Sequence, residues 1–150
     1  ILKKKFTGYN AFSKVNAITD LFDKDEQEIL ETKYIYELRS MFYLNDGNNH
    51  FAGEALPKKA QISTIEDFYV DNNEIIYTGN YIDFVTELGQ LDGNSGGILR
   101  FADNIIQEQK SLQLPKEFSG RKIVKLSKNN YLVLSNNGSS YIIDTKKLDK

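Results

Sequence analysis

Three carboxylates lie in the glycine-rich loop between the two apolar runs of residues 74–102, and they are the residues best placed to do chemistry. They are Asp83, Glu87 and Asp92, and the stretch also contains Gly89, Gly93, Gly96 and Gly97. Paired carboxylates catalyse glycoside hydrolysis, and oxygen ligands of this kind also bind calcium. The structural alternative is that Asp92, in the turn at 91–93, accepts backbone N–H bonds and holds the loop in shape.

Aromatic residues near these carboxylates suggest a second kind of site. Tyr77, Tyr81 and Phe84 are candidates for stacking on a sugar ring or on a partner side chain. Packing in the core is the alternative role for the same rings. The loop therefore predicts either ligand recognition or a structural connection.

Other catalytic arrangements have little support in the sequence. His50 is the single histidine and cysteine is absent, so a zinc site or a Ser-His-Asp triad lacks partners. Ser95, between glycines, superficially resembles a nucleophile elbow, but that motif needs a strand–Ser–helix context and a histidine. We expect no catalytic residue, no metal ligand and no cofactor.

The composition is typical of a globular domain rather than of a nucleic-acid-binding or membrane-spanning chain. Of 150 residues, 40% are hydrophobic and 27% charged, and the formal net charge is −2. A nucleic-acid surface normally needs a basic excess. No apolar run approaches the roughly 18 residues of a membrane helix. Because the chain begins with Ile1, we expect a processed chain or a piece of something longer.

Helical spacing is confined to the N-terminal part of the chain, about residues 9–31. Phe12, Val15, Ile18 and Phe22 recur at helical intervals. Asp23, with Glu26 three residues later, resembles a capping box that starts a short helix through residues 29–30.

The rest of the chain has strand signals separated by Asn, Asp and Gly turns. Residues 33–56 predict a β-hairpin around the turn at 45–48, where Asp-Gly supplies positive φ. Further strands are expected within residues 61–79, 97–101, 105–114, 122–126, 131–134 and 141–143, giving about nine or ten in all. Such spacing indicates an antiparallel sandwich, barrel or propeller, and the repeated strand–turn–strand unit favours propeller blades.

The segment 79–96 resembles a signature of the bacterial FG-GAP/VCBS-repeat β-propeller family, relatives of the propellers of integrin α chains and of cartilage acidic protein. The matching residues are Gly79-Asn80-Tyr81, Glu87-Leu88-Gly89-Gln90-Leu91-Asp92 and Gly96. The hairpin region, the helical region at 12–22 and residues 131–137 are also similar, so the resemblance covers most of the chain. It corresponds to the C-terminal portion of the family's propellers.

This resemblance implies a mainly β fold of antiparallel propeller blades with a short helical N-terminal segment. We expect one partial propeller domain over 1–150, in which 1–32 are helical, 33–145 form blade strands and 146–150 are a frayed tail. The family's calcium loops read Asp-x-Asp-x-Asp-Gly, whereas residues 71–74 offer only two carboxylates. We therefore predict no binding at micromolar calcium.

The function implied is a non-enzymatic module that binds a protein or a glycan in a secreted or cell-surface protein. The candidate ligand-binding residues are Asn80, Tyr81, Glu87 and Asp92. The expected partners are a protein or glycan and the remaining blades of a longer chain, without nucleic acid or a membrane span. Two alternatives stay open: a structural scaffold with no ligand of its own, and a carbohydrate-active enzyme that uses the loop carboxylates.

Overall fold

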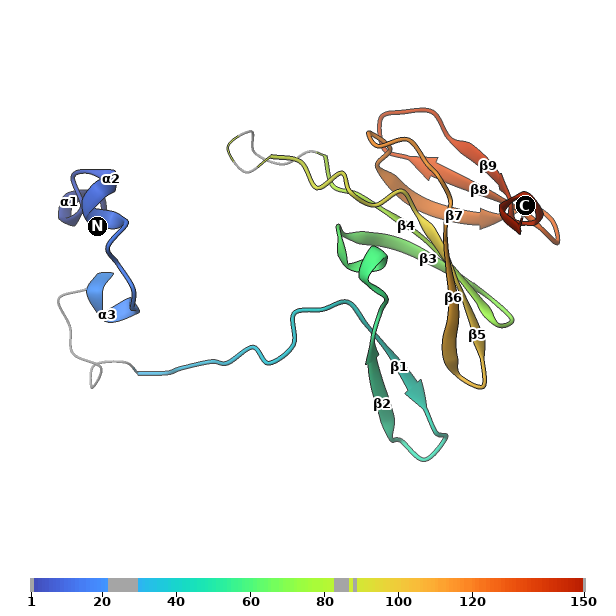
Figure 1. Ribbon diagram of the computed structural model, residues 1–150, viewed down its shortest axis with the longest axis horizontal. Coiled ribbons are helices and arrows are strands. Elements are labelled where there is room, and N and C mark those ends of the chain that lie inside the picture. The colour runs from blue at the N-terminus through green and yellow to red at the C-terminus, as the bar shows by residue number, and fades with distance from the viewer. Residues whose placement is uncertain (1, 22–29, 83–86, 88, 150) are drawn as a thin grey trace. The chain divides into compact units, whose positions relative to one another are not determined.

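The computed structural model describes residues 2–21, 30–82, 87 and 89–149 (Figure 1). The chain divides into two compact units, Ile1–Leu38 and Arg39–Lys150. The prediction of a mainly β protein is confirmed, because 41% of the chain is strand and 14% helix, in three antiparallel sheets of two, four and three strands. Within the described residues, no helix is long and apolar enough to cross a membrane.

The first unit contains short helical turns in place of the predicted helix. They are α1 (Leu2–Lys5), α2 (Tyr9–Phe12) and α3 (Ile18–Leu21). The Asp20 carboxylate accepts the backbone N–H groups of Asn16 and Ala17, each at 3.0 Å. Those amides therefore belong to the start of a new helical turn, and the prediction of one continuous helix through them is wrong. The predicted capping box at 23–26 lies outside the described residues.

The second unit begins with a hairpin, β1 (Met41–Asn45) and β2 (Phe51–Ala55), followed by the 3₁₀ helix η2 (Lys58–Gln61). This confirms the hairpin and its turn, but residues 33–40 are not a strand. The Gln61 side chain explains where pairing ends. Its Oε1 accepts the Ser40 N–H at 2.8 Å, and its Nε2 donates to the Ser40 carbonyl at 2.9 Å.

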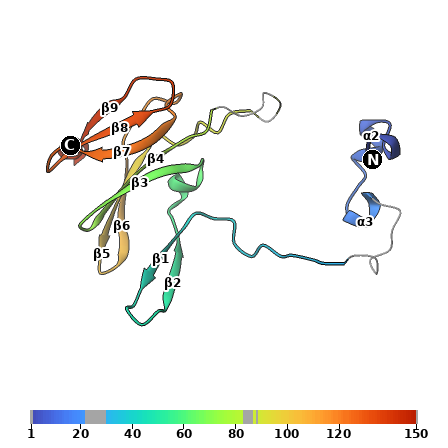
Figure 2. The ribbon, with the colours of Figure 1, turned by 180° about the vertical axis from the view of Figure 1, so that it is seen from behind.

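Four strands form the central sheet: β3 (Ile65–Asp71), β4 (Glu74–Gly79), β5 (Gly97–Ala102) and β6 (Ile105–Ser111). Their order is sequential, β3-β4-β5-β6, and every pair is antiparallel (Figures 1 and 2). Asn72 has a φ of +51°, and Asp103 and Asn104 have φ values of +52° and +64°. These residues make the tight turns that the sequence predicted.

The third sheet contains β7 (Gly120–Lys125), β8 (Asn130–Ser135) and β9 (Tyr141–Asp144), again in sequential order. After it, Thr145–Asp149 forms the 3₁₀ helix η4. Leu148 of this helix packs against the core. The expectation of a frayed tail is therefore wrong for the described residues up to 149.

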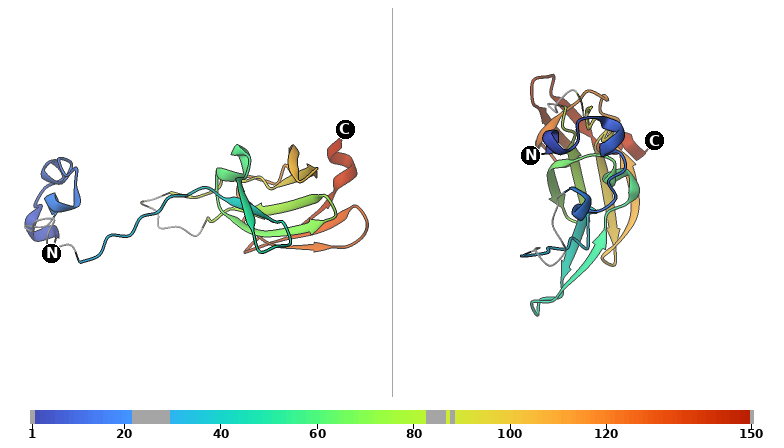
Figure 3. Two further views of the ribbon diagram at one scale, coloured as in Figure 1. Left: turned by 90° about the horizontal axis from the view of Figure 1, so that it is seen from below. Right: turned by 90° about the vertical axis from the view of Figure 1, so that its left-hand side faces the viewer.

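Both faces of the central sheet are buried, at least in part. Alternation along β4 sends Ile76 to one face and Tyr77 to the other. The first face packs on the third sheet, as Figure 3 shows, and this core contains Ile76, Ile98, Leu112, Leu114, Phe118, Ile123, Tyr131 and Val133. The second face carries Tyr77 and Leu99 with Ala60, and partly buried neighbours complete it.

A line of opposite charges joins β3 to β7, and we call it the charged seam. Its ion pairs are Glu66–Arg121 at 3.2 Å, Asp67–Lys122 at 3.1 Å and Asp71–Lys125 at 2.5 Å. Asp67 also accepts the backbone N–H of Ile123 at 2.7 Å. The two strands belong to different sheets, so these side chains replace a ladder of backbone hydrogen bonds.

Asp71 makes the seam sensitive to acid. Hydrogen bonds from the Lys125 ammonium and then from the Tyr131 hydroxyl lower the pKa of the Asp71 carboxyl below its ordinary value of 3.8. A lowered pKa contributes stability that is present above the ordinary value and is lost as the pH falls through the folded-state pKa. We expect Asp71→Asn to lower the melting temperature at pH 7, and this deficit to disappear in strong acid.

Thermal unfolding between pH 2 and 7 tests this, with Asp103→Asn in an exposed turn as the matched control. The control should melt with the parent throughout. A deficit of Asp71→Asn that is independent of pH contradicts the electrostatic explanation.

Candidate functional site

Residues 80–96 link β4 to β5, and an isolated antiparallel bridge between Tyr81 and Leu91 closes the base of this loop. The two residues exchange N–H···O bonds of 2.9 and 3.0 Å. Gly79 is required just before the bridge, since a Cβ there would lie 1.8 Å from the Thr64 carbonyl oxygen. Asp83 and Phe84 lie outside the described residues.

Asn80 is fully buried and connects the loop to the start of β7. Its Nδ2 donates to the Phe118 carbonyl at 3.0 Å, and its Oδ1 accepts the Asn94 N–H at 2.7 Å. Its own carbonyl accepts bonds from the Ser119 hydroxyl and the Arg121 guanidinium. Both ends of the side-chain amide are thus engaged within the protein, which makes Asn80 a framework residue in this structure.

Asn94 performs the role that we predicted for Asp92. Its Oδ1 accepts the Gly96 N–H at 2.9 Å while its Nδ2 donates to the Thr64 carbonyl at 3.0 Å. An amide can accept and donate at once, whereas a carboxylate only accepts. The Asp92 carboxylate instead faces the exposed ammonium of Lys116 at 3.3 Å. The prediction that Asp92 collects the loop amides therefore needs correction.

The two other predicted ligand residues lie at the surface. Tyr81 is 36% exposed, and the Arg121 guanidinium lies over its ring at 5.6 Å from the centroid. Glu87 is exposed. Tyr77, in contrast, is 3% exposed, and its hydroxyl accepts a bond from Gln109 at 2.9 Å. Burial raises the pKa of the Tyr77 hydroxyl, as expected for a core residue.

Neither His50 nor Ser95 has the surroundings of a catalytic group. The exposed His50 lies beside Asp46 on the hairpin, at 3.3 Å. Ser95 contacts the Ser111 hydroxyl at 2.9 Å and precedes a strand rather than a helix. In the part of the chain that the structure describes, no three His, Asp or Glu side chains gather to hold a metal ion.

The loop at 71–74 has a feature that opposes calcium binding. The Asp71 carboxylate is already bonded to the Lys125 ammonium and the Tyr131 hydroxyl. A calcium ion would have to displace a positive charge from its first ligand. The absence of binding at micromolar calcium stays a prediction.

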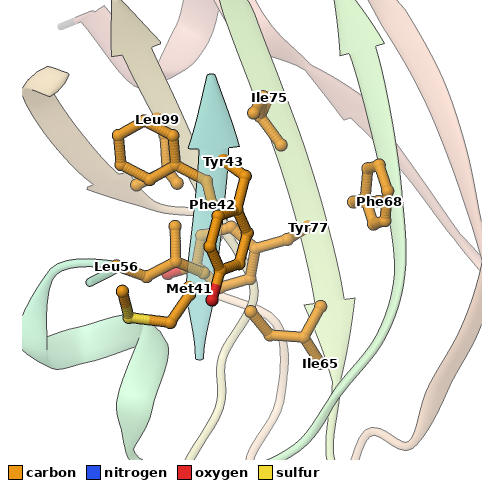
Figure 4. Close-up of a pocket in the computed structure, with 9 residues that line it drawn as sticks. All are labelled: Met41, Phe42, Tyr43, Leu56, Ile65, Phe68, Ile75, Tyr77 and Leu99. Atoms are coloured by element: carbon orange, nitrogen blue, oxygen red, sulfur yellow. The ribbon is translucent and has the colours of Figure 1, made fainter. Parts of the chain in front are cut away.

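A cavity of about 340 Å³ lies between the hairpin and the central sheet, and we call it the apolar cleft (Figure 4). Its lining residues are Met41, Phe42, Tyr43, Leu56, Ile65, Phe68, Ile75, Tyr77 and Leu99. Three consecutive residues of β1 contribute, although strand side chains alternate between faces. The cleft is therefore not confined to one face of β1, and Leu56 lines it from just beyond the end of β2.

Two aromatic rings remain accessible at this cleft. Tyr43 is 61% exposed and Phe68 is 63% exposed. Gly53 allows the Tyr43 ring to lie across β2, because a Cβ at that position would be 2.6 Å from the ring. Phe42 packs edge-on against Phe101 at 5.5 Å and holds the hairpin to the sheet. No periodic sequence signal identified this site, since it depends on how two separate sheets meet.

The two buried asparagines should matter more for stability than Asp92. Removing either amide leaves buried backbone groups without partners, which costs about 1–3 kcal/mol for each such group. The Asp92–Lys116 pair is largely exposed on its lysine side, and such pairs contribute about 0–1 kcal/mol. We expect Asn80→Ala and Asn94→Ala to melt well below the parent and Asp92→Ala to melt close to it.

Thermal and urea unfolding of the three variants decide between these roles. An Asp92→Ala variant as unstable as Asn94→Ala would restore the carboxylate as the residue that holds the loop.

Comparison with known proteins gives no relative for this chain. No protein-family model, curated protein sequence or solved structure matches it. The resemblance of segment 79–96 to propeller repeats therefore rests on its motif residues alone.

Proposed function

We propose that residues 39–150 form a non-enzymatic protein-binding module, built from β-propeller blades within a larger protein. The observation that carries the proposal is the apolar cleft beside β1, with its accessible aromatic rings. Ligand sites are commonly concave, mainly apolar and about 300–1,000 Å³ in volume. The volume and lining of this cleft fall within that description.

The blade assignment is supported by sheet order. A propeller blade is a four-stranded antiparallel sheet, and β3-β4-β5-β6 has this form with each strand next to its neighbour in sequence. Sheet β7-β8-β9 covers one face of it, and η2 and the hairpin lie against the other. Faces covered on both sides are what neighbouring blades would produce.

The backbone of β1 offers hydrogen bonds along the cleft. Ser40 and Leu56 are bonded across the hairpin, as are Asp46 and His50. Because bonded pairs alternate in an antiparallel ladder, the N–H and C=O groups of Met41 and Tyr43 point away from β2. Among the described residues β2 is the sole ladder partner of β1. An extended partner segment can add a strand there and place alternate side chains in the cleft.

The lining favours a protein partner over a glycan. Sugars need several hydrogen-bonding groups beside an aromatic platform, but the polar side-chain groups of the cleft are the hydroxyls of Tyr43 and Tyr77. Apolar side chains need only surface to bury, at about 25 cal/mol per Å². A secreted or cell-surface location remains part of the proposal.

Selection from a library of short random peptides tests the proposal. We expect the enriched peptides to be extended, with apolar residues at alternate positions. Phe68→Ala should weaken their binding about fivefold or more, since exposed aromatic anchors carry much of such binding energy. Val70→Ala is the matched control, because Val70 lies on β3 with a similarly exposed side chain but does not line the cleft.

Three outcomes contradict the proposal. Peptides whose binding is unaffected by Phe68→Ala or by N-methylation of alternate amides do not use the cleft and the β1 edge. A glycan-array signal that depends on Tyr81 and Glu87 would favour the glycan alternative. Oligosaccharide turnover abolished by Asp92→Asn would identify an enzyme.

A scaffold role is the second candidate, and one observation favours it. The hairpin supplies two strands where a blade has four. Other strands of the same larger protein would then fill the cleft. In that case peptides bind residues 39–150, but the intact larger protein does not bind them.

A further inference from the structure

A second cavity has a volume of about 300 Å³, and we call it the polar cavity. Of its lining residues, Tyr77 is the one that also lines the apolar cleft. Its polar lining residues are Lys59 of η2, Tyr77 of β4, Asn94 and Ser95 of the loop, and Lys110 and Ser111 of β6, with Gly93 and Gly96 between them. We propose that the polar cavity binds a compact tetrahedral oxyanion, the sulfate or phosphate group of an ester.

The charges of the polar cavity favour an anion. None of its described lining residues is acidic. The Lys59 ammonium has no ion-pair partner among the described residues, and Lys59 lines the cavity from an exposed turn. Lys110 contacts Glu108 at 3.3 Å, but the same carboxylate is held more closely by Arg100, at 2.7 Å. An oxyanion between Lys59 and Lys110 would meet two ammonium groups.

The hydroxyl pair provides a further donor. Ser95 and Ser111 share one hydrogen bond of 2.9 Å, and the Ser111 oxygen also accepts the Gln113 N–H at 2.9 Å. Two hydroxyls carry two hydrogens, and their mutual bond uses one. Whichever serine donates within the pair, the other keeps a hydrogen that can be turned to a ligand oxygen. Such a donor beside two cations suits an oxyanion better than an uncharged ligand.

The loop wall of this cavity is fixed and allows a close approach. Gly96 has a φ of +70°, and its N–H is held by the Asn94 side chain. A Cβ on Gly93 would lie 2.4 Å from the Ile62 side chain, which would have to shift to make room for it. The wall is therefore backbone held in place by a buried amide. A tetrahedral group presents oxygens to several sides at once, which fits donors arriving from η2, β6 and the loop.

Calorimetric titration with inorganic sulfate, inorganic phosphate and acetate tests the proposal at constant ionic strength. We expect saturable binding of sulfate or phosphate and no saturable binding of acetate. Lys59→Gln and Lys110→Gln should each weaken the oxyanion about tenfold or more, as expected for loss of a charge-assisted bond. Lys58→Gln is the matched control, because Lys58 neighbours Lys59 in η2 and does not line the cavity.

Tighter binding of phosphate supports a phosphate ester, and tighter binding of sulfate supports a sulfate ester. The proposal is overturned if neither anion saturates, or if Lys58→Gln weakens binding as much as Lys59→Gln. It is equally overturned if both cavity variants bind like the parent. Thermal melting of each variant separates loss of the site from loss of the fold. Because Lys59 is exposed, we expect Lys59→Gln to have the same melting temperature as the parent. Peptide binding at the apolar cleft should persist in Lys59→Gln, so the two proposals fail independently.

Discussion

The constraint on which the second unit depends is the burial of two side-chain amides at a point where three segments meet. The Asn80 amide spans from the loop to the start of β7, and Asn94 spans from the loop to Thr64. A buried backbone group without a partner is costly, so the segments can come together only in the arrangement that satisfies both amides. This geometry also shapes the wall of the polar cavity at Gly96.

The apolar core and the charged seam act on the same pair of sheets in different ways. Burial of Ile76 and Val133 supplies attraction without direction, because apolar contacts tolerate sliding. The carboxylates of Asp67 and Asp71 supply the direction, since each must meet donors at fixed places on the third sheet. The sheets are thus held together mainly by burial and aligned mainly by polar contacts.

The sequence predicted elements whose causes are local and missed those whose causes are distant. Turns at Asn72 and Asp103 follow from short polar residues that tolerate positive φ, and they were found. The strand pairing expected before Ser40 is absent, and the Ser40 N–H goes instead to the side chain of Gln61, far along the chain. The prediction that Asp92 binds the backbone N–H groups of the loop failed, because only the fold shows that the same side chain must also donate a hydrogen bond to the Thr64 carbonyl. Both cavities arise where segments far apart in the sequence meet, and they have no periodic signature.

The sequential strand order has a consequence for how the chain folds. Every ladder in the three sheets joins strands that are neighbours in sequence, so hairpins can form after closing short loops, apart from the loop at 80–96. The contacts of Asn80 with Phe118 and of Asp71 with Tyr131 join residues much farther apart. We therefore expect the sheets to form early and their docking, with closure around Asn80, to set the folding rate. The same residues that align the sheets would then determine how quickly the unit reaches its native state.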